Sequence, residues 1–361
     1  MRRCEQSGTV RHNGGIPTQK ELARLAGVSA GTVSNVISGT KGVSEKARQK
    51  VLEAIRKLDY RPNLVARSLK TNRTNTLGII IPDLTNPFFP QVIRGAEFAA
   101  RERSYFLIVL DSDADEALEL ELISLLRSQR VDGILLVSAA ARWRGGKKFA
   151  TLDSRPPIVC VDRLPGGLDV DSVSADGRAA VEMGVAHLLS MGHSEIAIIT
   201  GPLTFEHERE RLSGYRQALQ RNGIKVRDSL IWASTFDGGE IESACRKGLR
   251  RFGNKPSALF TTNLLVALGA LRSIYAAGFT TPKDIAFATL DEITTADFFQ
   301  PAITTVIQPT FDMGYRAVEV LLERIAQGDA MGPRRKILLP TTLVVRSSSS
   351  FQHCHGVPQK A

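Results

Sequence analysis

Six polar side chains stand at or just beyond the ends of apolar runs in the larger, C-terminal part of the chain: Asp83, Asp111, Asp162, Asn263, Asp291 and Gln308. Carboxylates and amides in such places can hold the hydroxyl groups of a small molecule by hydrogen bonds. The sequence contains no P-loop, nucleophile elbow or metal-ligand spacing, so we expect neither an enzyme nor a cofactor. Each residue, taken alone, also fits a turn or a helix cap.

The elements that would position these side chains follow from the hydrophobic periodicity. It predicts strands over 77–81, 106–110, 133–137, 158–161, 196–200, 258–261, 285–290 and 304–307. It predicts helices over 91–102, 115–129, 177–191, 208–222, 238–252, 264–277 and 311–327. This alternation is typical of parallel sheets covered by helices, and about 270 residues suffice for two such lobes. Because ligands of these sheets bind beyond the carboxyl ends of strands, we expect the six side chains to meet in a cleft.

The net positive charge of the chain comes from its N-terminal part. Residues 1–76 hold 15 Lys and Arg against 5 Asp and Glu, whereas the whole chain holds 47 against 37. The remaining 285 residues are therefore neutral overall. A basic segment joined to a neutral body predicts one part that meets nucleic-acid phosphate and another with a separate task.

Two short helices open this basic segment. Thr18 and Glu21 form a capping-box pair, so a first helix begins near Gln19; Gly27 can end it in a left-handed conformation, and Ser29 can cap the next helix. Such a pair predicts a helix-turn-helix, whose second helix enters the major groove of DNA. An ordinary corner between two helices of a helical domain would show the same sequence pattern. The predicted DNA contacts here are Thr18, Ser29, Ala30, Gly31, Thr32, Ser34 and Asn35.

A third helix, capped by Ser44, is predicted to end at Pro62, which can also open a short hinge helix. Leu69 lies there between Arg67 and Lys70, as an apolar wedge for the minor groove requires, although a plain linker fits equally well. The hinge adds Asn63, Ala66, Arg67 and Leu69 to the predicted DNA contacts.

These segments together resemble the LacI/GalR family of bacterial transcription regulators. The motifs that carry the resemblance are LARLAGVS, TVS, VSEKAR, YRPN, ARSL and PDLTNPFF, and it extends from about residue 17 to residue 348. It implies an N-terminal all-α helix-turn-helix domain plus hinge helix, joined to an α/β two-lobed periplasmic-binding-protein-like effector domain. It also implies a cytoplasmic, nucleoid-associated homodimer, usually a repressor, that binds a near-palindromic operator in double-stranded DNA and answers to a small-molecule effector.

The resemblance also suggests which residues contact the effector. Arg211 stands in the motif ERLSGY, Asp162 in VDR, and Phe236 where an aromatic ring stacks on the ligand. The full predicted set is Asp83, Asn86, Phe88, Phe89, Asp162, Arg211, Phe236, Asn263, Asp291 and Gln308. Such a set suits a hydroxylated ring such as a sugar, and a nucleobase or a sugar acid remains open. Core packing is the alternative for the three phenylalanines.

Three positions depart from the family pattern. The family often has Asn-Asp where this chain has Asn263 and Leu264. It often has Gly-Phe-Asp-Asp where this chain has Thr-Leu-Asp-Glu at 289–292, so we expect one cleft carboxylate to be missing. Asn35 replaces the arginine most common after TVS. The expected function is therefore an effector-controlled repressor; the alternatives are control by a protein corepressor or by a nucleobase-type corepressor.

The expected boundaries are a polar basic tail at 1–16, the helix-turn-helix at 17–61, the hinge and linker at 62–76, the two lobes at 77–350 and a polar tail at 351–361. We expect a reduced cytosol for the four scattered cysteines, no signal peptide, no membrane partner, and no metal at His353, Cys354 and His355.

Overall fold

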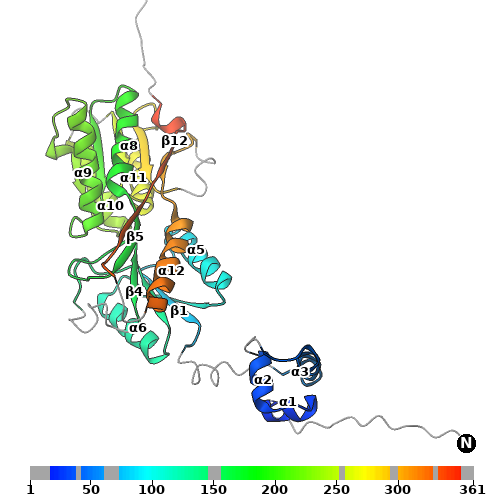
Figure 1. The fold of residues 1–361 in the computed structure, drawn as a ribbon. Helices are drawn as coiled ribbons and strands as arrows, with labels where there is room; N and C mark the ends of the chain where they lie inside the picture. Colours follow the sequence, from blue (N-terminus) through cyan, green and yellow to red (C-terminus); the bar gives the residue numbers. More distant parts are fainter. Residues whose placement is uncertain are drawn as a thin grey trace, which may run out of the picture. The chain divides into compact units, whose positions relative to one another are not determined.

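The computed structural model describes residues 17–37, 42–60, 73–144, 156–251, 257–292, 300–327 and 332–350. The chain divides into two compact units, Met1–Thr74 and Asn75–Ala361 (Figure 1). The predicted hinge contacts Asn63, Ala66, Arg67 and Leu69, and the tail residues His353, Cys354 and His355, lie outside the described residues.

The first unit packs three helices, α1 (Gln19–Ala26), α2 (Ala30–Ile37) and α3 (Glu45–Leu58), around one small core. Its buried side chains follow the predicted helical spacing: Leu22, Ala23, Ala26, Val33, Val51, Ala54 and Tyr60. A core of this size is thin, and the helix caps therefore matter for its stability.

The predicted caps of the first two helices are confirmed. Thr18 and Glu21 form the capping box, and Gly27 ends α1 with a φ of 62°. Ser29 Oγ accepts a hydrogen bond from Thr32 N–H at 3.1 Å. The end of α3 differs from the prediction: Asp59 closes it in the left-handed region, with a φ of 42°. Aspartate tolerates this conformation, so the chain leaves the helix before Pro62 is reached.

The first lobe of the second unit is a sheet in the order β11-β5-β4-β3-β1-β2, with every neighbouring pair parallel. Its strands are β1 (Thr76–Ile81), β2 (Phe106–Asp111), β3 (Gly133–Leu136), β4 (Ile158–Val161), β5 (Asp171–Ala175) and β11 (Lys336–Leu339). Alternate residues of β1 separate two cores: Ile79 packs with α5 (Phe88–Glu102) and α12 (Thr310–Gln327), and Ile80 packs with α6 (Glu116–Ser128).

The second lobe is a sheet in the order β12-β10-β9-β8-β6-β7, parallel except for the pairing of β12 with β10. Its strands are β6 (Ile196–Thr200), β7 (Ile231–Ala233), β8 (Ala258–Thr261), β9 (Ala286–Leu290), β10 (Thr304–Ile307) and β12 (Thr342–Val344). The helices α8 (Gly177–Ser190) and α9 (Glu206–Arg221) share one core, and α10 (Gly238–Arg251) and α11 (Leu264–Ala276) share the other.

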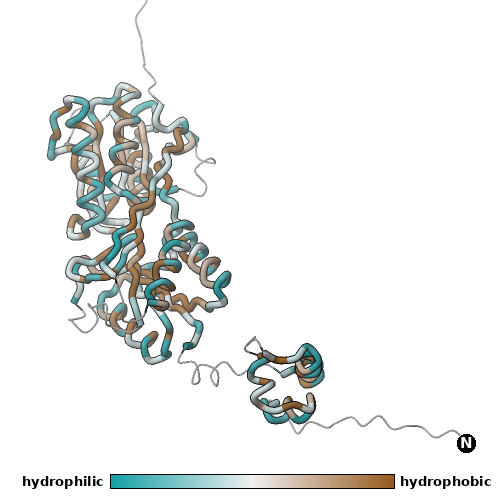
Figure 2. Tube along the Cα trace, in the orientation of Figure 1, coloured by the Kyte–Doolittle hydropathy of each residue, from teal (hydrophilic) through white to brown (hydrophobic). Residues whose placement is uncertain are grey.

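The chain passes between the lobes three times: from β5 to α8, from β10 to α12, and from β11 to β12. The strands β5, β7, β11 and β12 were not predicted, because β5 alternates with serines and the others are short or follow the last helix. Figure 2 shows the apolar strands inside each lobe and polar helix faces outside. Across the described ranges, no helix combines the length and the hydropathy needed to span a bilayer.

Candidate functional site

A cavity of about 320 Å³, called the interlobe cleft here, lies where the carboxyl ends of the two sheets face each other. Its lining consists of Asn86, Phe88, Phe89, Asp162, Arg163, His207, Arg211, Phe236, Asn263, Leu265 and Asp291. Eight of the ten side chains predicted from the sequence are among them.

Two strand-end carboxylates face the cleft from corresponding places in the two lobes. Asp162 follows β4 with a φ of 61°, and Asp291 follows β9 with a φ of 78°. The backbone N–H of Asp162 donates to Val173 O at 2.9 Å, and that of Asp291 donates to Val306 O at 3.0 Å. Left-handed conformations of non-glycine residues cost energy and concentrate at binding sites, so both carboxylates are held in place by the fold.

Asp291 is anchored on both oxygens. Gln308 Nε2 donates to Oδ1 at 2.5 Å, and the backbone N–H of Leu264 donates to Oδ2 at 3.2 Å. Burial raises the pKa of Asp291 to about 6, against the opposing effect of Arg211. Gln308 thus contacts Asp291 and does not line the cleft itself. The side chain of Leu264 belongs to the buried core of the second lobe, which accounts for the departure at that position.

Arg211 joins the two lobes across the cleft. Its Nη1 donates to Glu208 Oε1 at 2.8 Å, and its Nη2 lies 3.9 Å from Asp162 Oδ1. Its Nε is buried and has no hydrogen-bond partner within the described part of the chain. Burial lowers the pKa of Arg211, but the carboxylates of Glu208, Asp162 and Asp291 outweigh that effect and raise it. A buried cation with an unused N–H is suited to donate a hydrogen bond to an oxygen of a ligand.

Glu208 was not predicted. Its side chain is fully buried and accepts hydrogen bonds from Gly201 N–H at 3.0 Å, Thr262 Oγ1 at 2.7 Å and Arg211 Nη1. Asn263 Nδ2 lies 3.5 Å from Glu208 Oε1, the oxygen that also accepts from Arg211. Glu208 therefore positions two cleft residues from behind. Its spacing of three residues from Arg211 on one helix was the only sequence signal.

Arg163 was also missed, although it stands next to Asp162 in the VDR motif. Its guanidinium lies 4.9 Å from the ring centre of Phe236, 5.6 Å from that of Phe205 and 5.8 Å from that of Phe89. Its buried Nε has no hydrogen-bond partner among the described residues, and burial lowers its pKa. The three rings compensate this cation only in part, since a cation–π contact contributes about 0.5–2 kcal/mol.

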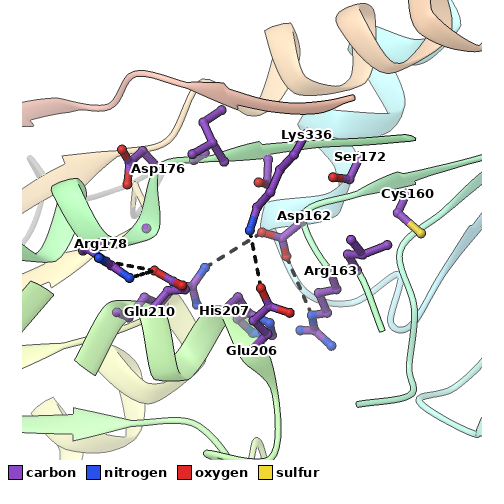
Figure 3. A pocket seen from close by; sticks show the side chains of 16 residues that line it. Cys160, Asp162, Arg163, Ser172, Asp176, Arg178, Glu206, His207, Glu210 and Lys336 are labelled. Carbon is purple, nitrogen blue, oxygen red and sulfur yellow. Dashed lines mark hydrogen bonds and ion pairs between the residues drawn. The ribbon is translucent and has the colours of Figure 1, made fainter. Parts of the chain in front are cut away.

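A second cavity of about 660 Å³ lies beside the cleft (Figure 3). It is called the hinge-side cavity here, because the chain passes between the lobes along its wall, from β5 to α8; the name does not refer to the hinge helix. It is lined from the first lobe by β4, β5 and β11 and from the second by the first turns of α8 and α9. Lys336 Nζ lies 3.4 Å from Glu206 Oε1, and Arg178 pairs with Glu210 at 2.8 Å. The cavity walls are thus charged but paired.

Asp83 lies outside both cavities. Its Oδ1 accepts hydrogen bonds from Thr85 N–H at 2.8 Å and Thr85 Oγ1 at 2.6 Å, so it shapes the turn after β1. Asn86 Oδ1 closes the next turn by accepting a hydrogen bond from Phe88 N–H at 3.1 Å, and Asn86 also lines the cleft. The strand-end rule placed Asp83 correctly along the chain but could not show which way the turn directs it.

The chemistry of the interlobe cleft is mixed rather than ionic. Three carboxylates, two guanidiniums, three amides and an imidazole surround or support a space bounded by three phenylalanine rings. Burial, together with Arg211, Arg163 and Arg209, holds the pKa of His207 well below its usual value, so this imidazole is neutral. The cleft offers both donors and acceptors with flat apolar faces, which suits a neutral polyhydroxylated ring.

The outer face of α2 carries the predicted DNA contacts. Ser29, Ala30, Gly31 and Asn35 are exposed, and Thr32 and Ser34 are half-buried. A Cβ added at Gly31 would meet only Ser29 Oγ, at 3.6 Å, so the unit itself does not require glycine there. Thr18 is engaged in the capping box. The exposed cations of α3 are Lys46, Arg48, Lys50, Arg56 and Lys57.

Comparison with known proteins agrees with both units. Residues 18–63 match the family model "Bacterial regulatory proteins, lacI family", and residues 185–349 match the periplasmic binding protein-like domain.

The ribose operon repressor of Escherichia coli (strain K12) is 35% identical over 334 residues, which are 92% of this chain and 100% of that protein. The transcriptional repressor PurR of Aliivibrio salmonicida is 32% identical over 335 residues, 92% and 99% of the two chains. The Lac repressor dimer bound to operator and the anti-inducer ONPF has a TM-score of 0.79 at 25% identity, covering 93% of this chain and 100% of that one. The chain therefore belongs to the lacI family of bacterial regulatory proteins, and it is a DNA-binding regulator of transcription.

Proposed function

We propose that the effector is D-ribose or a closely related pentose, that it binds in the interlobe cleft, and that it releases this repressor from its operator. The observation that carries the proposal is the cleft itself, where Asp162, Asp291 and Arg211 converge beside the ring of Phe236. The similarity to a ribose operon repressor over 92% of the chain supports the same ligand class. The proposed contacts are the lining residues of the cleft, with Glu208 and Gln308 behind them.

On the DNA side, two copies place the outer faces of their α2 helices in successive major grooves of a near-palindromic site. The edge strand β2 supports dimer formation, because Phe106 is 63% exposed and Ile108 and Val109 are each 36% exposed. The structurally similar Lac repressor is a dimer on its operator. In this proposal the protein acts in the cytoplasm, where its operator DNA lies. It binds its effector without converting it chemically.

A panel of ligands tests the effector class. D-Ribose should raise the Tm of the purified protein; at one hundred times its Kd the added stability is about 2.7 kcal/mol. D-Glucose, a hexose with one more carbon and hydroxyl group than ribose, should raise the Tm less if the cleft is fitted to a pentose. A protein that ignores every pentose would contradict the proposal.

A purine is the second candidate, because PurR proteins are 32–33% identical over the same length. The flat rings of Phe88, Phe89 and Phe236 would stack on a base as well as on a sugar. Hypoxanthine and guanine therefore belong in the same panel. Stabilisation by a purine and not by ribose would reverse the assignment, and stronger operator binding in the presence of that purine would make it a corepressor.

The base read by Asn35 is a separate prediction. An asparagine can pair with the N6 and N7 atoms of adenine, whereas arginine prefers guanine. We expect Asn35→Arg to move the preference of one base pair in each half-site from A·T to G·C, by about 1–3 kcal/mol. Selection of binding sites from a random library measures this. An unchanged site would show that Asn35 does not contact a base.

Effector affinity should depend on pH through Asp291. Its carboxylate accepts ligand hydroxyls best when ionised, so affinity should fall by about tenfold between pH 7.5 and pH 5. Calorimetry at several pH values measures this, and Asp291→Asn should remove the slope. Because the folded pKa of about 6 lies above the usual value of 3.8 for an aspartate, the contribution of Asp291 to folding stability is present below about pH 4 and is lost as the pH rises through 6.

A further inference from the structure

The interlobe cleft and the hinge-side cavity share one wall. Asp162, Arg163, His207 and Arg211 line both cavities, so these four side chains lie between them. Figure 3 shows Asp162, Arg163 and His207 among the side chains that line the hinge-side cavity. Without the wall, the two cavities would be continuous, and a ligand larger than a free pentose could extend from one into the other. The size of the effector therefore depends on what keeps the wall closed.

Three of the four wall residues are held by strong contacts. Arg211 donates to Glu208 at 2.8 Å and lies 3.9 Å from Asp162, while the Asp162 backbone is tied to Val173. Arg163 lies against the rings of Phe89, Phe205 and Phe236. The Nε of Arg163 also lies 3.7 Å from Asp162 Oδ2. Removing any of these three would change the balance of buried charge, so they cannot vary cheaply.

His207 is the fourth and the least constrained. It makes no hydrogen bond to any residue that the structure describes; its Nε2 lies 3.7 Å from Glu208 Oε1, which exceeds hydrogen-bond distance. Its ring lies 5.4 Å from that of Phe205, and 14% of its side chain is exposed. A neutral imidazole in this place can be shortened without leaving an unpaired charge.

We propose that His207 is the residue that sets the size limit of the effector, by closing the wall between the cleft and the hinge-side cavity. The inference rests on the proposed function, because it assumes that a pentose ring occupies the cleft. A substituent on that ring would have to pass His207 to reach the polar side chains beyond it, among them Ser172, Ser174 and Lys336. The native protein is therefore expected to favour a free pentose over its glycosides.

The test compares D-ribose with uridine, a ribose that carries a large substituent on its anomeric carbon. Calorimetry on the full-length protein should give ribose binding and no detectable uridine binding. In His207→Ala, the affinity for ribose should fall by no more than about tenfold, whereas uridine binding should appear and the uridine-to-ribose affinity ratio should rise by about tenfold or more. The variant His207→Asn, which retains a polar side chain of smaller size, should show the same direction and guards against a folding defect of the alanine variant.

Glu210→Ala is the matched control, because Glu210 lines the hinge-side cavity and not the cleft. It should enlarge that cavity and leave the uridine-to-ribose ratio unchanged. The proposal is overturned if the native protein binds uridine as tightly as ribose, or if folded His207 variants leave the ratio unchanged. A native protein that binds no pentose at all would instead remove the proposed function on which the inference rests.

Discussion

Arg211→Ala should weaken ribose binding by at least about 100-fold while leaving DNA affinity within about threefold of the native value. Arg211 contacts Glu208 at 2.8 Å and Asp162 at 3.9 Å, and its free Nε is positioned to donate to the ligand. Alanine removes these donors and leaves the fully buried Glu208 without its cation, while Asp162 keeps, within the described part of the chain, only Arg163 at 3.7 Å. Calorimetry with ribose and fluorescence anisotropy with operator DNA measure the two effects separately.

Arg178→Ala is the control for this change, because Arg178 pairs with Glu210 at the surface of the hinge-side cavity and is half-exposed. It should alter ribose affinity little, as exposed ion pairs contribute about 0–1 kcal/mol. If Arg211→Ala binds ribose as tightly as the native protein does, the ligand does not lie in the interlobe cleft. If it also loses DNA binding, the variant has lost its fold rather than its ligand contact.

The second large effect concerns stability. Arg324 is 3% exposed and donates from Nη2 to Asp171 Oδ1 at 2.8 Å, and from its Nε to the other oxygen of that carboxylate. It also donates to Gly332 O at 2.9 Å and Pro333 O at 2.7 Å. Arg324→Ala should lower the free energy of unfolding by about 3–5 kcal/mol, because the buried Asp171 loses its two-pronged partner and keeps, among the described residues, only the backbone N–H of Arg335 at 2.7 Å and the Arg335 Nε at 3.6 Å.

Urea unfolding followed by circular dichroism measures this loss. Arg316→Ala is the matched control on the same helix, since its pair with Glu319 is partly exposed and should contribute less than about 1 kcal/mol. Arg324 joins α12 to β5 and to the segment that enters β11, so its loss should also loosen one of the three connections between the lobes. A loss below about 1 kcal/mol for Arg324→Ala would show that the pair is dispensable.

Local sequence patterns were sufficient for most of the fold. The capping box of Thr18 and Glu21 and the left-handed Gly27 depend on neighbours within a few residues, and both were predicted. The eight predicted strands have long apolar runs, and the structure contains all of them. The strands β5 and β11 pair only with each other and with β4, so their β structure depends on distant residues rather than on their own composition.

The same distinction separates the predicted from the missed site residues. Asp162, Asn263 and Asp291 were found because parallel strands bring their carboxyl ends together. Glu208 and His207 lie in the first turn of α9, where a run of charged residues resembles an exposed helix face. Only the folded lobe reveals that Glu208 is buried and that His207 is largely covered. Asp83 shows the reverse case: it follows a strand as expected, but its turn directs it to Thr85 instead of the cleft.

The most direct test of the account is the effect of D-ribose on a preformed protein–operator complex. The operator fragment is first selected from genomic DNA with ligand-free protein at near-physiological salt, because affinity for DNA depends strongly on salt. Fluorescence anisotropy then follows the complex as ribose is added. The account predicts that ribose releases the native protein at a concentration near its measured Kd, while Arg211→Ala stays bound. A native complex that ribose leaves intact or strengthens, or an Arg211→Ala complex that ribose releases equally well, would contradict it.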